Sequence, residues 1–133
     1  MVLVDDCVDM FNPKVVRSTA GSLFHLPILT MGTDDFFAWC DTHELAVYAA
    51  DVYGTDSRQP ESLTDVIAAP ETLAGAKAVL FGNEARGLTK EVLERTDRIV
   101  SIPLYGKAES LNLGTSSAVM LLSLAMSSHV ERM

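Results

Sequence analysis

The amino-acid sequence predicts an α/β fold: a parallel sheet covered by helices on both faces. Several short runs are continuously apolar, among them 1–4, 45–50 and 78–81, and such runs are typical of parallel strands buried on both sides. Segments with helical spacing of apolar residues separate them. The chain has 133 residues, 48% of them hydrophobic, which is enough to bury a core, so we expect one domain spanning residues 1–133.

In the first half of the chain, strands and helices are expected to alternate. A strand at 1–5 is followed by a helix that begins at Asn12-Pro13 and runs to about Leu23, with the Asn as N-cap and the Pro at the first helical position. The segment PILTM is the next strand, and DDFFAWCDTH is a helix with acidic residues in its first turn. A third strand follows at LAVYAAD.

The second half continues the same alternation after a long connection. Glycine and proline make 52–75 mostly loop, with a short helical turn near 63–67. The segment KAVLFG is then a strand, TKEVLERTD a helix, RIVSIP a strand, and the chain from Ser110 onward a long helix. The run AVMLLSLAM in that last helix is too short to span a bilayer, so we expect a buried helix and no membrane role.

The charge distribution is uneven and on balance acidic. The net charge is −8. Residues 1–76 hold three basic and twelve acidic side chains, whereas 77–133 hold seven and six. The chain therefore lacks the basic stripe of a free-standing nucleic-acid binder. Other protein surface would have to supply much of the affinity for an RNA substrate. Two isolated cysteines, Cys7 and Cys40, and the lack of an apolar signal stretch at Met1 indicate a cytoplasmic protein.

The segment GNEARGL, directly after the apolar run AVLF, is the strongest local motif. Its two glycines have the spacing of a phosphate-binding P-loop, but Leu88 stands where the lysine is needed and Lys90 comes two positions late. A nucleotide hydrolase is therefore disfavoured, while a turn with only a folding role stays open. Glu84 favours a ligand site, because it lies at a strand end, where open α/β sheets bind ligands.

A receiver-like signalling domain is a second possible class. The acidic pair Asp5-Asp6 at the end of the first strand resembles that of a response-regulator receiver domain, and Asp51, at the end of the strand LAVYAA, would then be the phosphoacceptor. No later strand ends in the Ser, Thr or Lys that would stabilise a phosphoryl group. The three histidines, His25, His43 and His129, have no ligand spacing, so we expect no metal site.

FGNEARGL together with SIPLYGKAESLNLGTSSA resembles the second and third signature motifs of the SpoU/TrmH family of RNA ribose 2′-O-methyltransferases, in the SPOUT class. NPKVVRSTAGSLFHLPI is also similar to the corresponding segment of thiostrepton-resistance-type ribosomal RNA methyltransferases. The resemblance covers nearly the whole chain. It implies a C-terminal trefoil knot, S-adenosylmethionine as cofactor, a homodimer, and ribosomal or transfer RNA as partner.

The resemblance also implies site residues. The cofactor would be held mainly by backbone groups and apolar walls, with Ala50 bordering the adenine; the other cofactor residues are Gly82, Asn83, Ile102 and Leu111. A side chain at Gly82 is expected to intrude where backbone must approach the cofactor. Asn112, Ser110 and Glu84 would be catalytic by orienting the ribose or a catalytic arginine.

The family's first motif, an Asn followed by the Arg thought to promote deprotonation of the ribose hydroxyl, is not matched. Asn12 and Arg17 imitate it with an interval one residue short. We therefore expect the domain to be N-terminally incomplete and this chain to transfer methyl groups poorly or not at all on its own. A cofactor-binding fragment without independent activity remains the nearest alternative, with Arg17 as a substitute base a further possibility.

Overall fold

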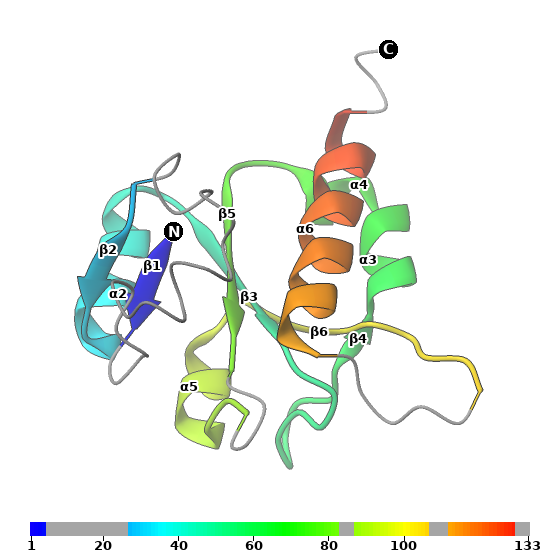
Figure 1. Ribbon diagram of the computed structural model, residues 1–133, viewed down its shortest axis with the longest axis horizontal. Coiled ribbons are helices and arrows are strands. Elements are labelled where there is room, and N and C mark those ends of the chain that lie inside the picture. Colours follow the sequence, from blue (N-terminus) through cyan, green and yellow to red (C-terminus); the bar gives the residue numbers. More distant parts are fainter. Residues whose placement is uncertain (5–26, 83–86, 107–111, 130–133) are drawn as a thin grey trace. The chain divides into compact units, whose positions relative to one another are not determined.

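The computed structural model describes residues 1–4, 27–82, 87–106 and 112–129. Within these residues the chain forms two compact units, Met1–His43 and Glu44–Met133 (Figure 1). Each unit is α/β, with parallel strands and helices. The expected class is confirmed, whereas the expectation of one domain over 1–133 stays a prediction.

The first unit is a parallel strand pair followed by a helix. Strands β1 (Val2–Val4) and β2 (Leu29–Met31) pair with Val2 opposite Leu29, and helix α2 spans Thr33–Thr42. Two acidic residues lie in the first turn of α2, as expected from the helix dipole. Its buried side chains are Phe36, Phe37 and Cys40. The helix expected to begin at Asn12-Pro13 lies outside the described residues.

The second unit is built on a four-stranded parallel sheet. Its strands are β3 (Ala46–Ala50), β4 (Glu61–Ser62), β5 (Lys77–Phe81) and β6 (Arg98–Ser101). Their order is β4-β6-β3-β5, so β3 has a neighbour on each side. Its helices are α3 (Leu63–Ala68), α4 (Pro70–Leu73), α5 (Lys90–Arg95) and α6 (Leu113–His129).

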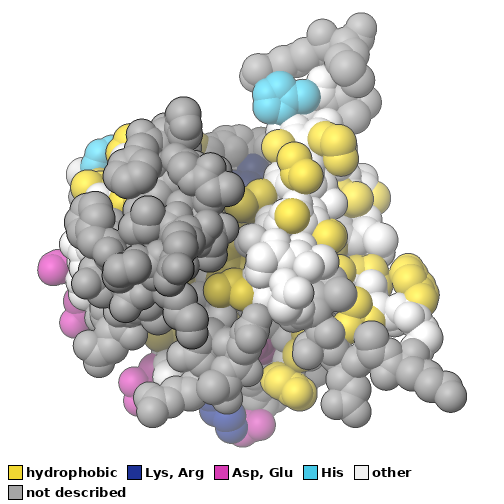
Figure 2. Space-filling view, viewed as in Figure 1, with side chains coloured by type: hydrophobic (Ala, Val, Ile, Leu, Met, Phe, Trp, Pro, Cys, Tyr) yellow, Lys and Arg dark blue, Asp and Glu magenta, His cyan; other side chains and the backbone are white. Residues whose placement is uncertain are grey.

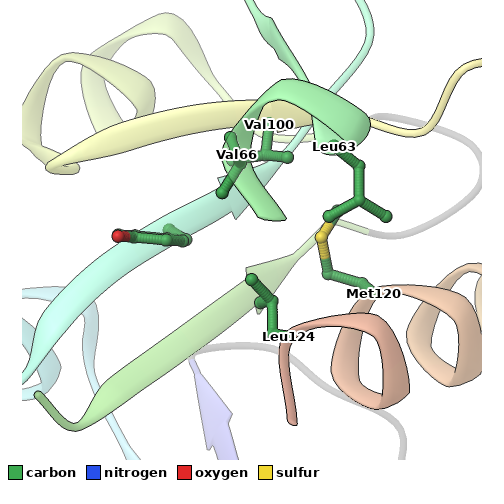
Figure 3. Close-up of a cluster of buried hydrophobic side chains, with 6 residues drawn as sticks. Leu63, Val66, Val100, Met120 and Leu124 are labelled. Atoms are coloured by element: carbon green, nitrogen blue, oxygen red, sulfur yellow. The ribbon is translucent and has the colours of Figure 1, made fainter. Parts of the chain in front are cut away.

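Helices cover both faces of this sheet, as expected. Alternate residues of a strand point to opposite faces. Tyr48 and Val100 belong to the main core cluster, which Figure 3 shows between the sheet and helices α3 and α6. Its other buried members are Leu63, Val66, Met120 and Leu124. The neighbouring residues Ala49 and Ile99 instead pack with Leu93 of α5, on the other face.

The connection after β3 holds more structure than the sequence predicts. Residues 52–75 include β4 and two short helices, and Pro70 occupies the first turn of α4 rather than breaking a helix. The buried hydroxyl of Tyr48 donates to the carbonyl of Thr72 at 2.6 Å, which ties β3 to α4. Burial also raises the pKa of Tyr48, although the positive charge of Arg98 opposes that shift.

Helix α6 packs into the core along one side only. It starts at Leu113, three residues later than expected, and buries Met120 and Leu124. The expectation that the run AVMLLSLAM forms a buried helix is therefore only partly met, because several of its apolar residues are exposed: Ala118, Leu121, Leu122 and Ala125. Figure 2 shows hydrophobic side chains exposed along this helix. Among the described helices, none is long and apolar enough to cross a membrane.

The expected knot depends on the path of the chain through 83–86 and 107–111. These ranges lie outside the described residues, so the knot stays an expectation.

Asp97 fixes the alignment of β6 with β3. Its backbone N–H donates to the carbonyl of Val47 at 2.8 Å, and its carboxylate oxygen Oδ2 accepts from the N–H of Val47 at 2.7 Å. One residue thus satisfies both backbone groups of Val47 where the two strands begin.

We expect Asp97→Ala to lower the free energy of unfolding by about 1 kcal/mol, because the N–H of Val47 loses its acceptor. Asp97→Asn keeps an acceptor oxygen and should lose less. Urea denaturation followed by circular dichroism measures both variants. Equal losses for Ala and Asn would show that the hydrogen bond to Val47 is not what stabilises the strand pair.

Candidate functional site

Three of the residues proposed from the sequence meet at one edge of the four-stranded sheet. Ala50 ends β3, Gly82 directly follows β5, and Ile102 directly follows β6. Ala50 lies opposite Phe81 on one side and Val100 on the other. Because all these strands are parallel, their carboxyl ends share an edge. Ala50 and Ile102 are half-buried and pack against the main core cluster.

The start of α6 lies at this same edge. A groove at the opposite edge is lined by Lys77, which begins β5, together with Leu124 and His129 near the end of α6. Helix α6 therefore runs antiparallel to the strands, as Figure 1 shows. Asn112, the residue before α6, is thus brought to the carboxyl edge with Ala50, Gly82 and Ile102.

Asn112 caps helix α6. Its side-chain oxygen Oδ1 accepts from the N–H of Thr115 at 2.8 Å, and its carbonyl accepts from the N–H of Ser116 at 2.9 Å. These are the bonds of an N-cap residue. Since the cap uses the amide oxygen, any contact with a ribose falls to the amide NH₂ group.

Gly82 and Gly87 lie in direct backbone contact. A Cβ atom added at Gly82 would overlap the carbonyl carbon of Gly87 and come within 2.7 Å of the nitrogen of Leu88. Gly87 itself has φ +64°, a conformation that favours glycine. The two glycines of GNEARGL therefore close the turn against itself. This contact gives Gly82 a structural reason to be glycine, separate from the close approach to a cofactor that the sequence predicts.

Asp51, directly after β3, shapes the next loop. Its carboxylate oxygen Oδ2 accepts from the N–H of Tyr53 at 3.0 Å and from the N–H of Gly54 at 2.7 Å. Its other oxygen, Oδ1, lies 4.0 Å from the position of a Cβ added at Gly87. Asp51 thus holds its own loop beside the glycine turn, which is a structural role rather than that of a phosphoacceptor.

Arg58 fastens this loop to α5, and no feature of the sequence pointed to it. The guanidinium donates to the carbonyl of Leu93 at 2.6 Å and to the carbonyl of Asp97 at 3.2 Å. Ser57 adds a hydrogen bond from its hydroxyl to the carboxylate of Glu94 at 3.0 Å. Hydrogen bonds from Thr55 and Ser57 lower the pKa of Glu94. A lone arginine in a polar loop carries no distinguishing pattern, so only the structure identifies this anchor.

The remaining proposed residues lie outside the described residues. These are Asn83 and Glu84 between the two glycines of GNEARGL, Ser110 and Leu111 before α6 in the sequence, and Asn12 and Arg17 near the start of the chain. Their proposed roles stay predictions.

Each histidine in the described part of the chain has a ring nitrogen close to a backbone carbonyl of its own helix. Nδ1 of His43 lies 2.9 Å from the carbonyl of Trp39, and Nδ1 of His129 lies 2.7 Å from the carbonyl of Ala125. Both contacts span one helical turn at a helix end. In the described ranges, no three His, Cys, Asp or Glu side chains are grouped so that they could hold a metal ion.

Known proteins are similar to this chain in sequence and in fold. The chain is similar to the 23S rRNA (guanosine(2553)-2'-O)-methyltransferase RlmP of Bacillus subtilis (strain 168), with 33% identity over 121 residues, covering 91% of this chain and 45% of that protein. It is also 30% identical over 122 residues to the 23S rRNA (uridine(2479)-2'-O)-methyltransferase of Streptomyces viridochromogenes, covering 91% of this chain and 41% of the relative.

A solved structure, that of an AdoMet-bound rRNA methyltransferase from Sinorhizobium meliloti, matches with a TM-score of 0.76 and 30% identity, covering 94% of this chain and 44% of that one. The chain thus spans less than half the length of each of these proteins. Residues 1–122 match the SpoU rRNA Methylase family. The motif resemblance is confirmed, the receiver-like alternative is not favoured, and the chain belongs to the SpoU rRNA methylase family.

Proposed function

We propose that this protein transfers a methyl group from S-adenosylmethionine to a ribose 2′-hydroxyl of ribosomal or transfer RNA. The observation that carries the proposal is the meeting of Ala50, Gly82, Ile102 and Asn112 at one sheet edge in a member of this family. The relatives named above are 2′-O-methyltransferases. Such a role fits the cytoplasmic location that the sequence predicts.

The described residues at this edge fit the cofactor. Its adenine and methionine parts need apolar walls and backbone hydrogen-bonding groups more than they need charge. Ala50 and Ile102 supply half-buried apolar surface, and strand ends leave backbone N–H and C=O groups for a ligand. When bound, the cofactor supplies an activated methyl group for in-line displacement.

The residues of this chain would align the acceptor rather than activate it. Asn112 stands at the start of α6, and its amide can orient a ribose. Glu84 and Ser110 are proposed to assist it, as carboxylate acceptor and hydroxyl donor. None of the three is a strong base for a ribose hydroxyl. Deprotonation of the hydroxyl is therefore assigned, from the family resemblance, to the arginine of the first motif, with Arg17 as the alternative. Because a guanidinium is normally protonated, this arginine must first release a proton before it can accept one from the ribose.

We also propose that two copies of the chain pair through α6. The helix exposes Leu121, Leu122 and Met126, with 49%, 59% and 64% of each residue accessible. Large apolar side chains on successive turns of one helix are costly to leave in water. A twofold axis beside α6 would bury the same face on both copies.

The first test concerns the cofactor. Calorimetric titration with S-adenosylmethionine and S-adenosylhomocysteine should show binding to the wild-type chain. We expect Gly82→Ala to weaken it at least about tenfold, close to 1.4 kcal/mol, because the new Cβ displaces the backbone of Gly87 and Leu88. Gly75→Ala is the matched control: Gly75 precedes β5 at the opposite edge, has φ +78° and has open space around it.

Both glycine variants should lose some thermal stability, so affinity is the deciding quantity. No binding to a folded wild type, or equal losses in the two variants, would contradict a cofactor site at this edge.

The second test concerns the base. Transfer of tritiated methyl groups to total ribosomal and transfer RNA should be slower for this chain, by about 10²-fold or more, than for a version extended upstream through a strand and an N-x-G-x-x-x-R segment. Asn112→Ala should slow the extended version. If this chain is as fast as the extended one and Arg17→Ala abolishes its activity, Arg17 is the base.

The third test concerns pairing. Sedimentation at micromolar concentration should show a dimer for wild type and a monomer for Leu122→Lys, because a buried charge without a partner destabilises an interface. Leu122→Met keeps the apolar surface and should remain dimeric. Circular dichroism melts check that both variants are folded. We expect them to fold, because Leu122 is 59% exposed. A monomeric wild type, or a dimeric Leu122→Lys, would exclude α6 as the interface.

A further inference from the structure

Two tyrosines of the second unit are unusually exposed. Tyr53 is 85% accessible and Tyr105 is 84% accessible, more than any other exposed large hydrophobic residue within the described ranges. Aromatic rings gain much from burial, so leaving two of them in water has a cost that folding does not explain. Both lie in loops, where binding residues concentrate.

The two loops leave the same edge of the sheet. Tyr53 is three residues beyond the end of β3, and Tyr105 is four residues beyond the end of β6. Strands β3 and β6 are direct neighbours, and the N–H of Asp51 donates to the carbonyl of Val100 at 3.1 Å just where they end. At about 3.5 Å per residue, the Cα atom of each tyrosine lies within about 10–14 Å of the end of its strand.

The loop that carries Tyr53 is held firmly in place. The backbone N–H of Tyr53 is itself bonded to Asp51. Gly54 has φ +68°, and a Cβ there would overlap the carbonyl oxygen of Arg58. Thr55 and Arg58 exchange backbone hydrogen bonds of 2.8 and 3.3 Å, and Arg58 anchors the loop to α5. The exposure of Tyr53 is therefore a property of an ordered loop and not of a loose chain end.

The negative net charge of the chain limits the kinds of contact that it can make with RNA. A protein of net charge −8 gains little from phosphate neutralisation. Near the first loop, the side chains of Asp56 and Lys90 form an exposed pair at 3.8 Å, which offsets the lysine charge. Stacking of bases on aromatic rings needs no net charge and accepts any base. Among the described residues of this edge, the exposed rings can therefore offer RNA a contact that does not depend on charge.

We propose that Tyr53 and Tyr105 form a stacking platform for unpaired RNA bases beside the target nucleotide. The inference rests on the proposed function, because RNA is the substrate that the function requires. Sequence-directed RNA enzymes act mostly on loops and bulges, whose unstacked bases lie free to stack on aromatic side chains. Rings at the carboxyl edge would hold the flanking bases while the acceptor ribose faces Asn112.

The test uses fluorescence anisotropy with a labelled unstructured oligoribonucleotide and the same strand in a duplex. Wild type should bind the single strand more tightly than the duplex. Tyr53→Ala and Tyr105→Ala should each weaken single-strand binding by roughly five- to 100-fold. Tyr53→Phe and Tyr105→Phe keep the ring and should bind like wild type. Calorimetry with S-adenosylmethionine should give the wild-type affinity for all four variants.

The two proposals fail in different ways. Wild-type binding that does not prefer the single strand, or alanine variants that bind as well as wild type, overturns the platform even if the cofactor binds. Loss of the dimer in the alanine variants would also overturn it, by assigning the rings to a protein interface. If the alanine variants lose RNA affinity while wild type binds no cofactor, the stacking platform is supported and the proposed methyl transfer is contradicted.

Discussion

The parallel register of β3 between β5 and β6 is the constraint on which the rest of the second unit depends. Ala50 is aligned with Phe81 on one side and with Val100 on the other. The double contact of Asp97 with Val47 sets this alignment from the other edge. A slip of one residue would exchange the faces of a strand, moving apolar side chains from one core cluster to the other. The ends of the three strands would then no longer coincide.

Once the register is set, few further interactions are needed to shape the site at the carboxyl edge. Gly87 lies against the end of β5, because the backbones of Gly82 and Gly87 are in contact. The loop after β3 is bent by Asp51 and anchored by Arg58. Helix α6 is capped by Asn112 at the same edge. Each of these interactions is a hydrogen bond to a backbone group or a backbone contact of a glycine. The edge therefore suits a ligand that is recognised by shape and hydrogen bonding.

The sequence predicted the regular elements well because their signals are local. Continuous apolar runs predicted β1, β3 and β5, and acidic residues marked the start of α2. The strand β4 and the helix α4 were missed, since two and four residues are too few to show a period. Proline was interpreted as a breaker at 70, although it favours the first turn of a helix.

For the site, the motifs predicted which strand ends converge but not how the loops are held. The anchor at Arg58 depends on carbonyls 35 and 39 residues away, and no local pattern reports a contact at that separation. The contact of Gly82 with Gly87 is likewise a property of the folded turn. The glycine spacing was visible in the sequence, while its reason, closure of the chain on itself, was not.

The acidic composition and the family assignment become compatible once the two kinds of RNA contact are separated. Phosphate contacts supply much of RNA affinity and require positive charge, whereas base contacts require flat apolar surface and hydrogen-bonding groups. The described carboxyl edge offers exposed rings and polar backbone, and its Lys90 is paired with Asp56. On the proposal made above, such a surface would select unpaired bases over duplex, because unpaired bases expose both faces to a ring. A second copy of the chain, or further protein, would then supply the phosphate contacts, and this edge would contribute base stacking and a preference for single-stranded RNA.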